Sequence, residues 1–217
     1  MAATGFPSVT VTSARRDRSN DVAALGLTVK SGWASAVLLT RAGGSLRVAD
    51  SRIVLLSDPT VPEARQPYHA GFGSARAAGA VLSRLLASVR RFGRTSISDL
   101  LRQYAAAGYR IRGAGIVVGS MVDPRTIGND HIRIHALEGQ LFRTVVVTSL
   151  ARRRIACSIW RDRDLPGLAG ERLRKPERAV RAALVTLKPD GAGGPWRAEQ
   201  KAAALAAWIV LDGRRAG

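Results

Sequence analysis

Cysteine and long apolar runs are scarce in this sequence of 217 residues, and each scarcity excludes a class of protein. Cys157 is the only cysteine, so the chain can form neither an internal disulfide nor a zinc site of several cysteines, and we expect a reducing compartment. The longest strongly apolar run, residues 202–211, has about half of the ~20 residues that span a bilayer. The sequence therefore predicts a cytoplasmic protein with no membrane-spanning segment.

Acidic residues are also few: 16 Asp or Glu stand against 34 Lys or Arg, which gives a formal charge of +18. The surplus is concentrated in residues 76–112 and 143–181. Basic faces of this kind bind phosphate backbones, so nucleic acid is the expected partner; a solvated surface or an acidic protein partner is the alternative. A homo-oligomer or a larger complex remains open. The candidate nucleic-acid contacts are Arg84, Arg90, Arg91, Arg94, Arg152, Arg153 and Arg154.

The rest of the composition is that of a folded protein. Hydrophobic residues make up 46% of the chain and charged residues 23%, which argues against extensive disorder. Residues 1–20 are small, polar and without sustained periodicity, so we expect a flexible tail there. Residues 21–217 are long enough for one good-sized core and are predicted to form a single domain.

Apolar runs and turn residues predict five strands. Three come first, at 22–29, 33–41 and 45–57, separated by tight turns at Lys30-Ser31-Gly32 and Ala42-Gly43-Gly44. A loop follows over 58–73. Two more strands are expected at 109–119 and 154–160.

Helical spacing of apolar residues predicts the segments between and after these strands. One helix should begin at Ser74 and stop at Gly93, and a second should run from Ser96 to Gly108. A third is expected from about 130 to 152, and two more near Pro176 and Pro195, after a polar loop. The order β-β-β-α(α)-β-α-β-α-α predicts an α/β fold: a mixed five-stranded sheet, three antiparallel strands then two βαβ crossovers, with helices on both faces.

This order, together with the segment GLTVKSGWA at residues 26–34, resembles the ribonuclease H-like superfamily, most nearly its RuvC-type Holliday-junction resolvase branch. The resemblance covers about residues 22–211. It implies nucleic acid as the ligand and a metal site made of carboxylates. The expected acidic positions are missing: Thr28 stands where the first Asp should be, Gly119-Ser120 follow the fourth strand, and the last helix offers only Glu199. Two-metal phosphodiester chemistry needs several carboxylates, so this site is expected to be catalytically degenerate.

A second cluster is expected at the carboxyl edge of the sheet, where open α/β folds place ligands. His131, His135 and Glu138 have the spacing of one helical face and could bind a divalent metal ion, with Asp123 or His69 completing the set. Asp123, His131, His135 and Glu138 are thus the candidate catalytic residues of a metal-dependent nuclease or phosphohydrolase with a relocated site. Alternatively, Asp130 caps the helix, His131 is solvated and Glu138 pairs with a nearby arginine.

The same edge could instead hold a phosphate. Lys30, Arg65, His69 and Ser120 are the candidate residues for such an anion pocket, next to the start of the helix at Asp130. Whether the protein is an enzyme, a nucleic-acid-binding domain or a non-catalytic assembly subunit stays open. Cys157 falls inside a predicted strand and is expected to be a core residue rather than a nucleophile.

Overall fold

The computed structural model describes residues 21–70, 79–189 and 195–213. The predicted tail, residues 1–20, and the predicted helix start at Ser74 lie outside these ranges. The five predicted strands are confirmed and form one sheet in the order β3-β2-β1-β4-β5. Their bounds are Asp21–Lys30 (β1), Trp33–Ala42 (β2), Ser45–Leu55 (β3), Tyr109–Val118 (β4) and Cys157–Arg161 (β5).

The sheet is mixed, as predicted. β1, β2 and β3 are consecutive antiparallel neighbours, and the turn glycines Gly32, Gly43 and Gly44 all have positive φ, which the tight turns require. β4 pairs in parallel with β1, and β5 pairs in parallel with β4. The carboxyl ends of β1, β3 and β4 therefore lie at one edge of the sheet, where the candidate site was predicted.

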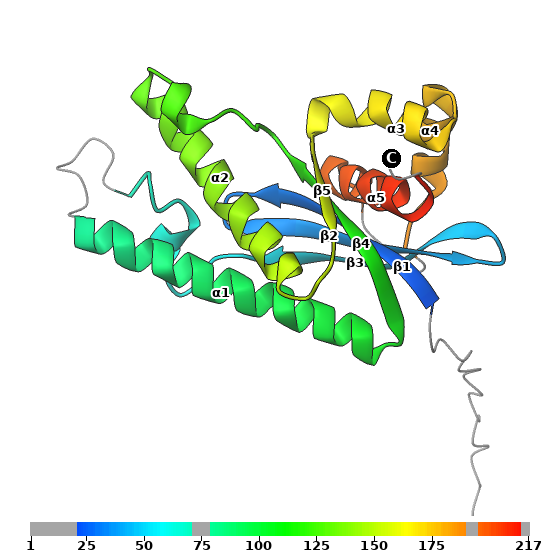
Figure 1. The fold of residues 1–217 in the computed structure, drawn as a ribbon, viewed down its shortest axis with the longest axis horizontal. Coiled ribbons are helices and arrows are strands. Elements are labelled where there is room, and N and C mark those ends of the chain that lie inside the picture. Colours follow the sequence, from blue (N-terminus) through cyan, green and yellow to red (C-terminus); the bar gives the residue numbers. More distant parts are fainter. Residues whose placement is uncertain (1–20, 71–78, 190–194, 214–217) are drawn as a thin grey trace, which may run out of the picture.

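Helices cover both faces of the sheet (Figure 1). The helices α1 and α2 lie on one face, while α3, α4 and α5 lie on the other (Figure 1). Their bounds are Gly79–Ala106 (α1), Asp130–Ala151 (α2), Leu165–Leu173 (α3), Glu177–Thr186 (α4) and Ala198–Asp212 (α5); short 3-10 turns lie at Pro62–Arg65 (η1), Pro124–Thr126 (η2) and Asp162–Asp164 (η3). No helix among the described residues is long and apolar enough to cross a membrane.

The two helices predicted between β3 and β4 are a single one, α1, so the prediction that Gly93 ends a helix was wrong. Gly93 is buried, and a Cβ atom there would lie 2.6 Å from Val145 Cγ1 and 3.1 Å from the carbonyl oxygen of Leu56. The missing side chain lets α1 pack closely against α2 and the end of β3. The free energy gained by packing α1 against α2 and the sheet outweighs the low helix propensity of one glycine.

The prediction of a polar loop after β5 was also wrong, because residues 162–173 form η3 and α3. Leu165 and Ala169 of α3 are buried in the same cluster as α5. Two glycines and one proline obscure the helical pattern in the sequence, and packing against α5 stabilises the helix. α3 ends at Leu173, and Arg174, which caps the helix, adopts a left-handed conformation with φ 52°.

α5 lies directly on the sheet because two strand residues beneath it have no side chain. A Cβ atom at Gly26 of β1 would lie 1.7 Å from the carbonyl oxygen of Ala203, and one at Gly115 of β4 would lie 2.7 Å from that of Ala206. The facing residues of α5 are mostly alanines, so the helix backbone approaches the strands closely. This contact fixes the first turn of α5 against the carboxyl end of β1.

Candidate functional site

Two of the positions where the resemblance implied carboxylates, Thr28 and Glu199, meet at the start of α5, while Gly119 and Ser120 line a cavity with His135. Thr28 is 2% exposed, and its hydroxyl donates a hydrogen bond of 2.9 Å to the carbonyl oxygen of Glu199. Thr28 is in register with Val117 on β4, two residues before Gly119. Glu199 is the one carboxylate in the first turn of α5, and it is half-buried.

A cluster of imidazoles lies at the carboxyl edge of the sheet, on the face that α1 and α2 cover. Among the described residues, His69, His131 and His135 make the one group of three or more His, Cys, Asp or Glu side chains close enough to share a metal ion. One ring nitrogen from each lies within 4.8 Å of the others. The Nε2 atoms of His131 and His135 are 3.1 Å apart, and the His69 and His135 ring centroids are separated by 4.6 Å.

Helix α2 and the loop after η1 position these three rings. α2 is capped by Asn129, whose side chain accepts a hydrogen bond from the Ile132 N–H, so the prediction of Asp130 as the cap was wrong. Asp130 pairs instead with Arg133. His131 and His135 are exposed one helical turn apart, and His69 reaches them from a loop closed by its own N–H, which donates to Gln66 O at 3.0 Å.

Glu138 lies beneath the imidazoles. It is 1% exposed, and its Oε1 accepts hydrogen bonds from the backbone N–H groups of Tyr68 at 2.7 Å and His69 at 3.3 Å. The same oxygen is 3.4 Å from Nδ1 of the His69 ring. Glu138 thus neither pairs with an arginine nor joins the three imidazoles as a fourth ligand: its Oε1 holds residues 68 and 69 of the loop, and its Oε2 has no hydrogen-bond partner.

Burial shifts the ionisation of these groups. It raises the pKa of Glu138 to about 7, against the lowering effect of the two backbone N–H donors. Burial lowers the pKa of His69, and the neighbouring His131 lowers it further. The pKa of His135 is lowered by burial and then by His69 and His131. Imidazoles with lowered pKa are neutral at pH 7, which is the form that binds metals.

The other predicted ligand, Asp123, is occupied elsewhere. Its carboxylate accepts hydrogen bonds from the backbone and side chain of Arg125 within η2, and this partner lowers the pKa of Asp123. Asp123 is absent from the group of potential ligands among the described residues. The predicted catalytic set is therefore only half assembled: His131 and His135 come together, whereas Asp123 and Glu138 serve the surrounding structure.

The four residues of the predicted anion pocket line different spaces. Lys30 and Ser120 line a cavity of about 240 Å³ together with His135. Arg65 lines a separate cavity of about 540 Å³, with Trp33 and Asp58. His69 lies in the imidazole cluster. Neither of these two cavities contains all four residues.

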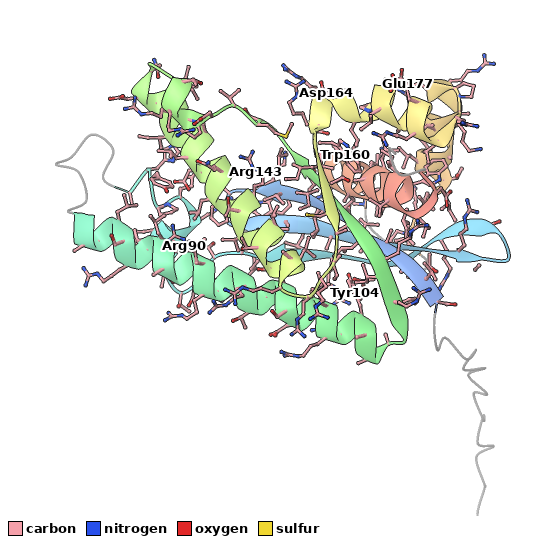
Figure 2. The ribbon with its side chains drawn as sticks, in the orientation of Figure 1. Arg90, Tyr104, Arg143, Trp160, Asp164 and Glu177 are labelled. Atoms are coloured by element: carbon pink, nitrogen blue, oxygen red, sulfur yellow. The ribbon has the colours of Figure 1, made fainter. Side chains whose placement is uncertain are left out.

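Three of the predicted arginines line one groove between α1 and α2, which the sequence did not predict as a single site. All seven predicted arginines are exposed, four on α1 and three directly after α2. Arg90, Arg94 and Arg152 line one groove of about 400 Å³. Figure 2 labels Arg90 on α1 and Arg143 on α2, the two helices that frame it. Gln140, Thr144 and Thr148 add polar side chains, and no acidic residue lines the groove.

Cys157 is half-buried in β5 opposite Ala114, and its burial raises the pKa of the thiol. We expect an aromatic disulfide reagent at pH 8 to modify the folded protein at least about tenfold more slowly than the urea-unfolded protein, because the thiolate is the reactive form. The absorbance of the released thiolate measures the rate. Equal rates in the folded and unfolded protein would contradict the core position of Cys157.

Comparison with known proteins identifies the fold. No protein-family model matches the sequence, and neither does any curated protein. Among solved structures, the chain is similar to Thermus thermophilus RuvC in complex with a Holliday junction substrate, at 9% identity and a TM-score of 0.50, over 87% of this chain and 91% of that one.

Two further structures are similar at lower scores. A second Thermus thermophilus RuvC structure has 10% identity and a TM-score of 0.45, over 87% of this chain and 93% of that one. The yeast mitochondrial Holliday junction resolvase Ydc2 has 10% identity and a TM-score of 0.42, over 88% of this chain and 78% of that one. With its mixed five-stranded sheet and two helical layers, the chain has the ribonuclease H-like fold that is found in RuvC.

Proposed function

We propose that this protein binds nucleic acid, with the phosphate backbone held in the groove between α1 and α2. The observation that carries the proposal is the charge of the groove. Arg90, Arg94 and Arg152 line it, and none of the three makes an ion pair within the described part of the chain. Three guanidinium groups without carboxylate partners form a cationic surface that attracts phosphates.

Branched DNA is the first ligand to test, because the similar RuvC structure holds a Holliday junction. Gln140 and Thr144 can hydrogen-bond phosphate or sugar oxygens between the arginines, whereas the Thr148 hydroxyl donates to the carbonyl oxygen of Thr144. Contacts of this type position a duplex without reading its sequence, so we propose binding that depends on backbone shape and charge rather than on base identity.

We further propose that the usual two-metal site of the fold is catalytically degenerate in this chain. Glu199 would be the single carboxylate at the implied positions, and the Thr28 hydroxyl is engaged with the Glu199 backbone. One carboxylate cannot hold two divalent ions ~3.5–4 Å apart and activate water between them. The proposed role is therefore to bind nucleic acid rather than to cut it at this site.

The binding proposal is tested by fluorescence-anisotropy titrations of a four-way junction, a duplex and a single strand, each at about 50 and about 200 mM salt. Three phosphate contacts predict that the logarithm of the binding constant falls with the logarithm of salt concentration with a slope of about −3. Absence of binding to all three ligands at the lower salt would contradict the proposal. Capture of one acidic protein, unaffected by nuclease, would point to the assembly-subunit alternative.

A further inference from the structure

We propose that His69, His131 and His135 form a binding site for one divalent transition-metal ion, with zinc as the best fit, and that Glu138 positions His69 in it. The site does not depend on the proposed nucleic-acid binding. It also lies apart from Thr28 and Glu199, which meet at the start of α5, since His131 and His135 belong to α2 on the other face of the sheet. Of the implied carboxylate positions, Gly119 and Ser120 line the same cavity as His135.

The first argument is convergence. Three imidazoles from two distant segments of the chain place one nitrogen each within 4.8 Å of the others. Zinc–imidazole bonds of ~2.0–2.1 Å put two tetrahedral ligands ~3.3 Å apart, and the His131 and His135 Nε2 atoms are already 3.1 Å apart. Because these two side chains are exposed, small rotations can bring both onto an ion held by the half-buried His69.

The second argument is an unpartnered polar atom. His69 Nε2 is buried and has no hydrogen-bond partner, although the His69 ring lies against His131 and His135. A buried polar atom without a hydrogen-bond partner destabilises the fold, so its presence needs an explanation. A metal ion bonded to Nε2 would supply the missing partner.

The third argument is the carboxylate behind the ring. Glu138 Oε1 is 3.4 Å from His69 Nδ1, on the opposite side of the imidazole from Nε2. In this arrangement the His69 Nδ1–H donates a hydrogen bond to the carboxylate, and the Nε2 atom keeps its lone pair, which is the tautomer a metal requires. The backbone N–H donors of Tyr68 and His69 hold the Glu138 carboxylate in place. Glu138 is therefore a positioning residue and not a ligand.

The donor set selects the metal. Three nitrogens without a carboxylate or carbonyl oxygen suit Zn²⁺ and its first-row neighbours, and they do not suit Mg²⁺ or Ca²⁺. Three protein ligands leave a coordination position open. His135 also lines the cavity of about 240 Å³ that contains Lys30 and Ser120, so an anion or water in that cavity would lie next to one of the three ligands.

The test is a titration of the full-length protein, freed of metal by chelator, with Zn²⁺ by calorimetry and with Co²⁺ by visible absorption. We expect one ion per chain and the intense absorption bands of four-coordinate Co²⁺. His131→Ala and His135→Ala should each weaken binding by about 100-fold or more, since each removes a ligand. Both residues are exposed, so circular dichroism should show an unchanged fold.

Two further variants separate positioning from general damage. Glu138→Gln should weaken binding by about 10- to 100-fold and alter the Co²⁺ spectrum while retaining one ion per chain, because it loosens the orientation of His69. Ile132→Ala is the matched control: this side chain lies next to His131 in the first turn of α2, is 56% exposed and carries no ligand atom. It should bind as the wild type does.

Two results would overturn the site. One is the absence of saturable binding of either metal up to about 100 μM free ion, a concentration far above the dissociation constants of zinc sites that fold around their metal. The other is binding that both histidine variants retain unchanged. Neither result bears on nucleic-acid binding, which the salt titrations test separately.

Discussion

Replacing Arg90, Arg94 and Arg152 together with alanine is expected to weaken the binding of a four-way junction by about 100-fold or more at about 100 mM salt. The three side chains line one groove, and none of them pairs with a carboxylate among the described residues, so their full charge is available to phosphates. The slope of the binding constant against salt should become shallower by about 3 because each lost phosphate contact removes about one released counterion. Anisotropy titrations at several salt concentrations measure both quantities.

A second triple variant of equal charge serves as the control. Lys175, Arg178 and Lys188 are exposed: Arg178 is in α4, Lys175 lies between α3 and α4, and Lys188 follows α4, and these helices cover the opposite face of the sheet. Replacing them with alanine lowers the net charge by the same amount and should leave the salt slope nearly unchanged. Equal losses in both triple variants would show that bulk charge, and not the groove between α1 and α2, is responsible for binding.

Gly26→Ala is expected to destabilise the protein by about 3 kcal/mol or more, or to prevent folding. The new Cβ atom would lie 1.7 Å from the Ala203 carbonyl oxygen and 2.6 Å from its carbon. Both are backbone atoms of α5, so the helix must move away from β1 and lose much of its apolar contact with the sheet. Urea unfolding followed by circular dichroism measures the change in free energy.

Gly139→Ala is the matched control, because a Cβ atom there meets no atom within 4 Å. Gly139 lies in the interior of α2, where alanine favours the helix by about 1 kcal/mol relative to glycine. We therefore expect opposite signs for the two substitutions. A Gly26→Ala protein as stable as the wild type would contradict the direct packing of α5 on β1.

The sheet could be predicted because its signals are local. Each strand of the sheet is an apolar run bounded by turn residues, and Gly32, Gly43 and Gly44 mark turns that need positive φ. The helix errors have a long-range cause. Gly93 is typical of a helix end by sequence alone, and only the approach of Leu56 and Val145 explains why the helix continues.

The candidate metal site could be predicted only in part. The spacing of His131 and His135 follows from helical periodicity, so both were found. The same periodicity assigned Glu138 to the ligand set, but burial and the backbone donors of residues 68 and 69 give that carboxylate another role. His69 was named with Asp123 as a residue that could complete the set, because the carboxyl ends of the third and fourth strands share one edge of the sheet. That His69 rather than Asp123 joins the cluster depends on a loop closing onto α2, which no spacing in the sequence encodes. The arginine groove was missed for a similar reason, since two chain segments form it.

The most direct test of a binding domain with a degenerate two-metal site is to incubate a labelled four-way junction with the wild-type protein in Mg²⁺, and separately in Mn²⁺. Binding is followed on a native gel and strand cleavage on a denaturing gel, with Glu199→Gln as the comparison. We predict a retarded junction with intact strands for both proteins. Cleavage that requires Mg²⁺ or Mn²⁺ and disappears in Glu199→Gln would contradict the degenerate site, and an unretarded junction would contradict nucleic-acid binding.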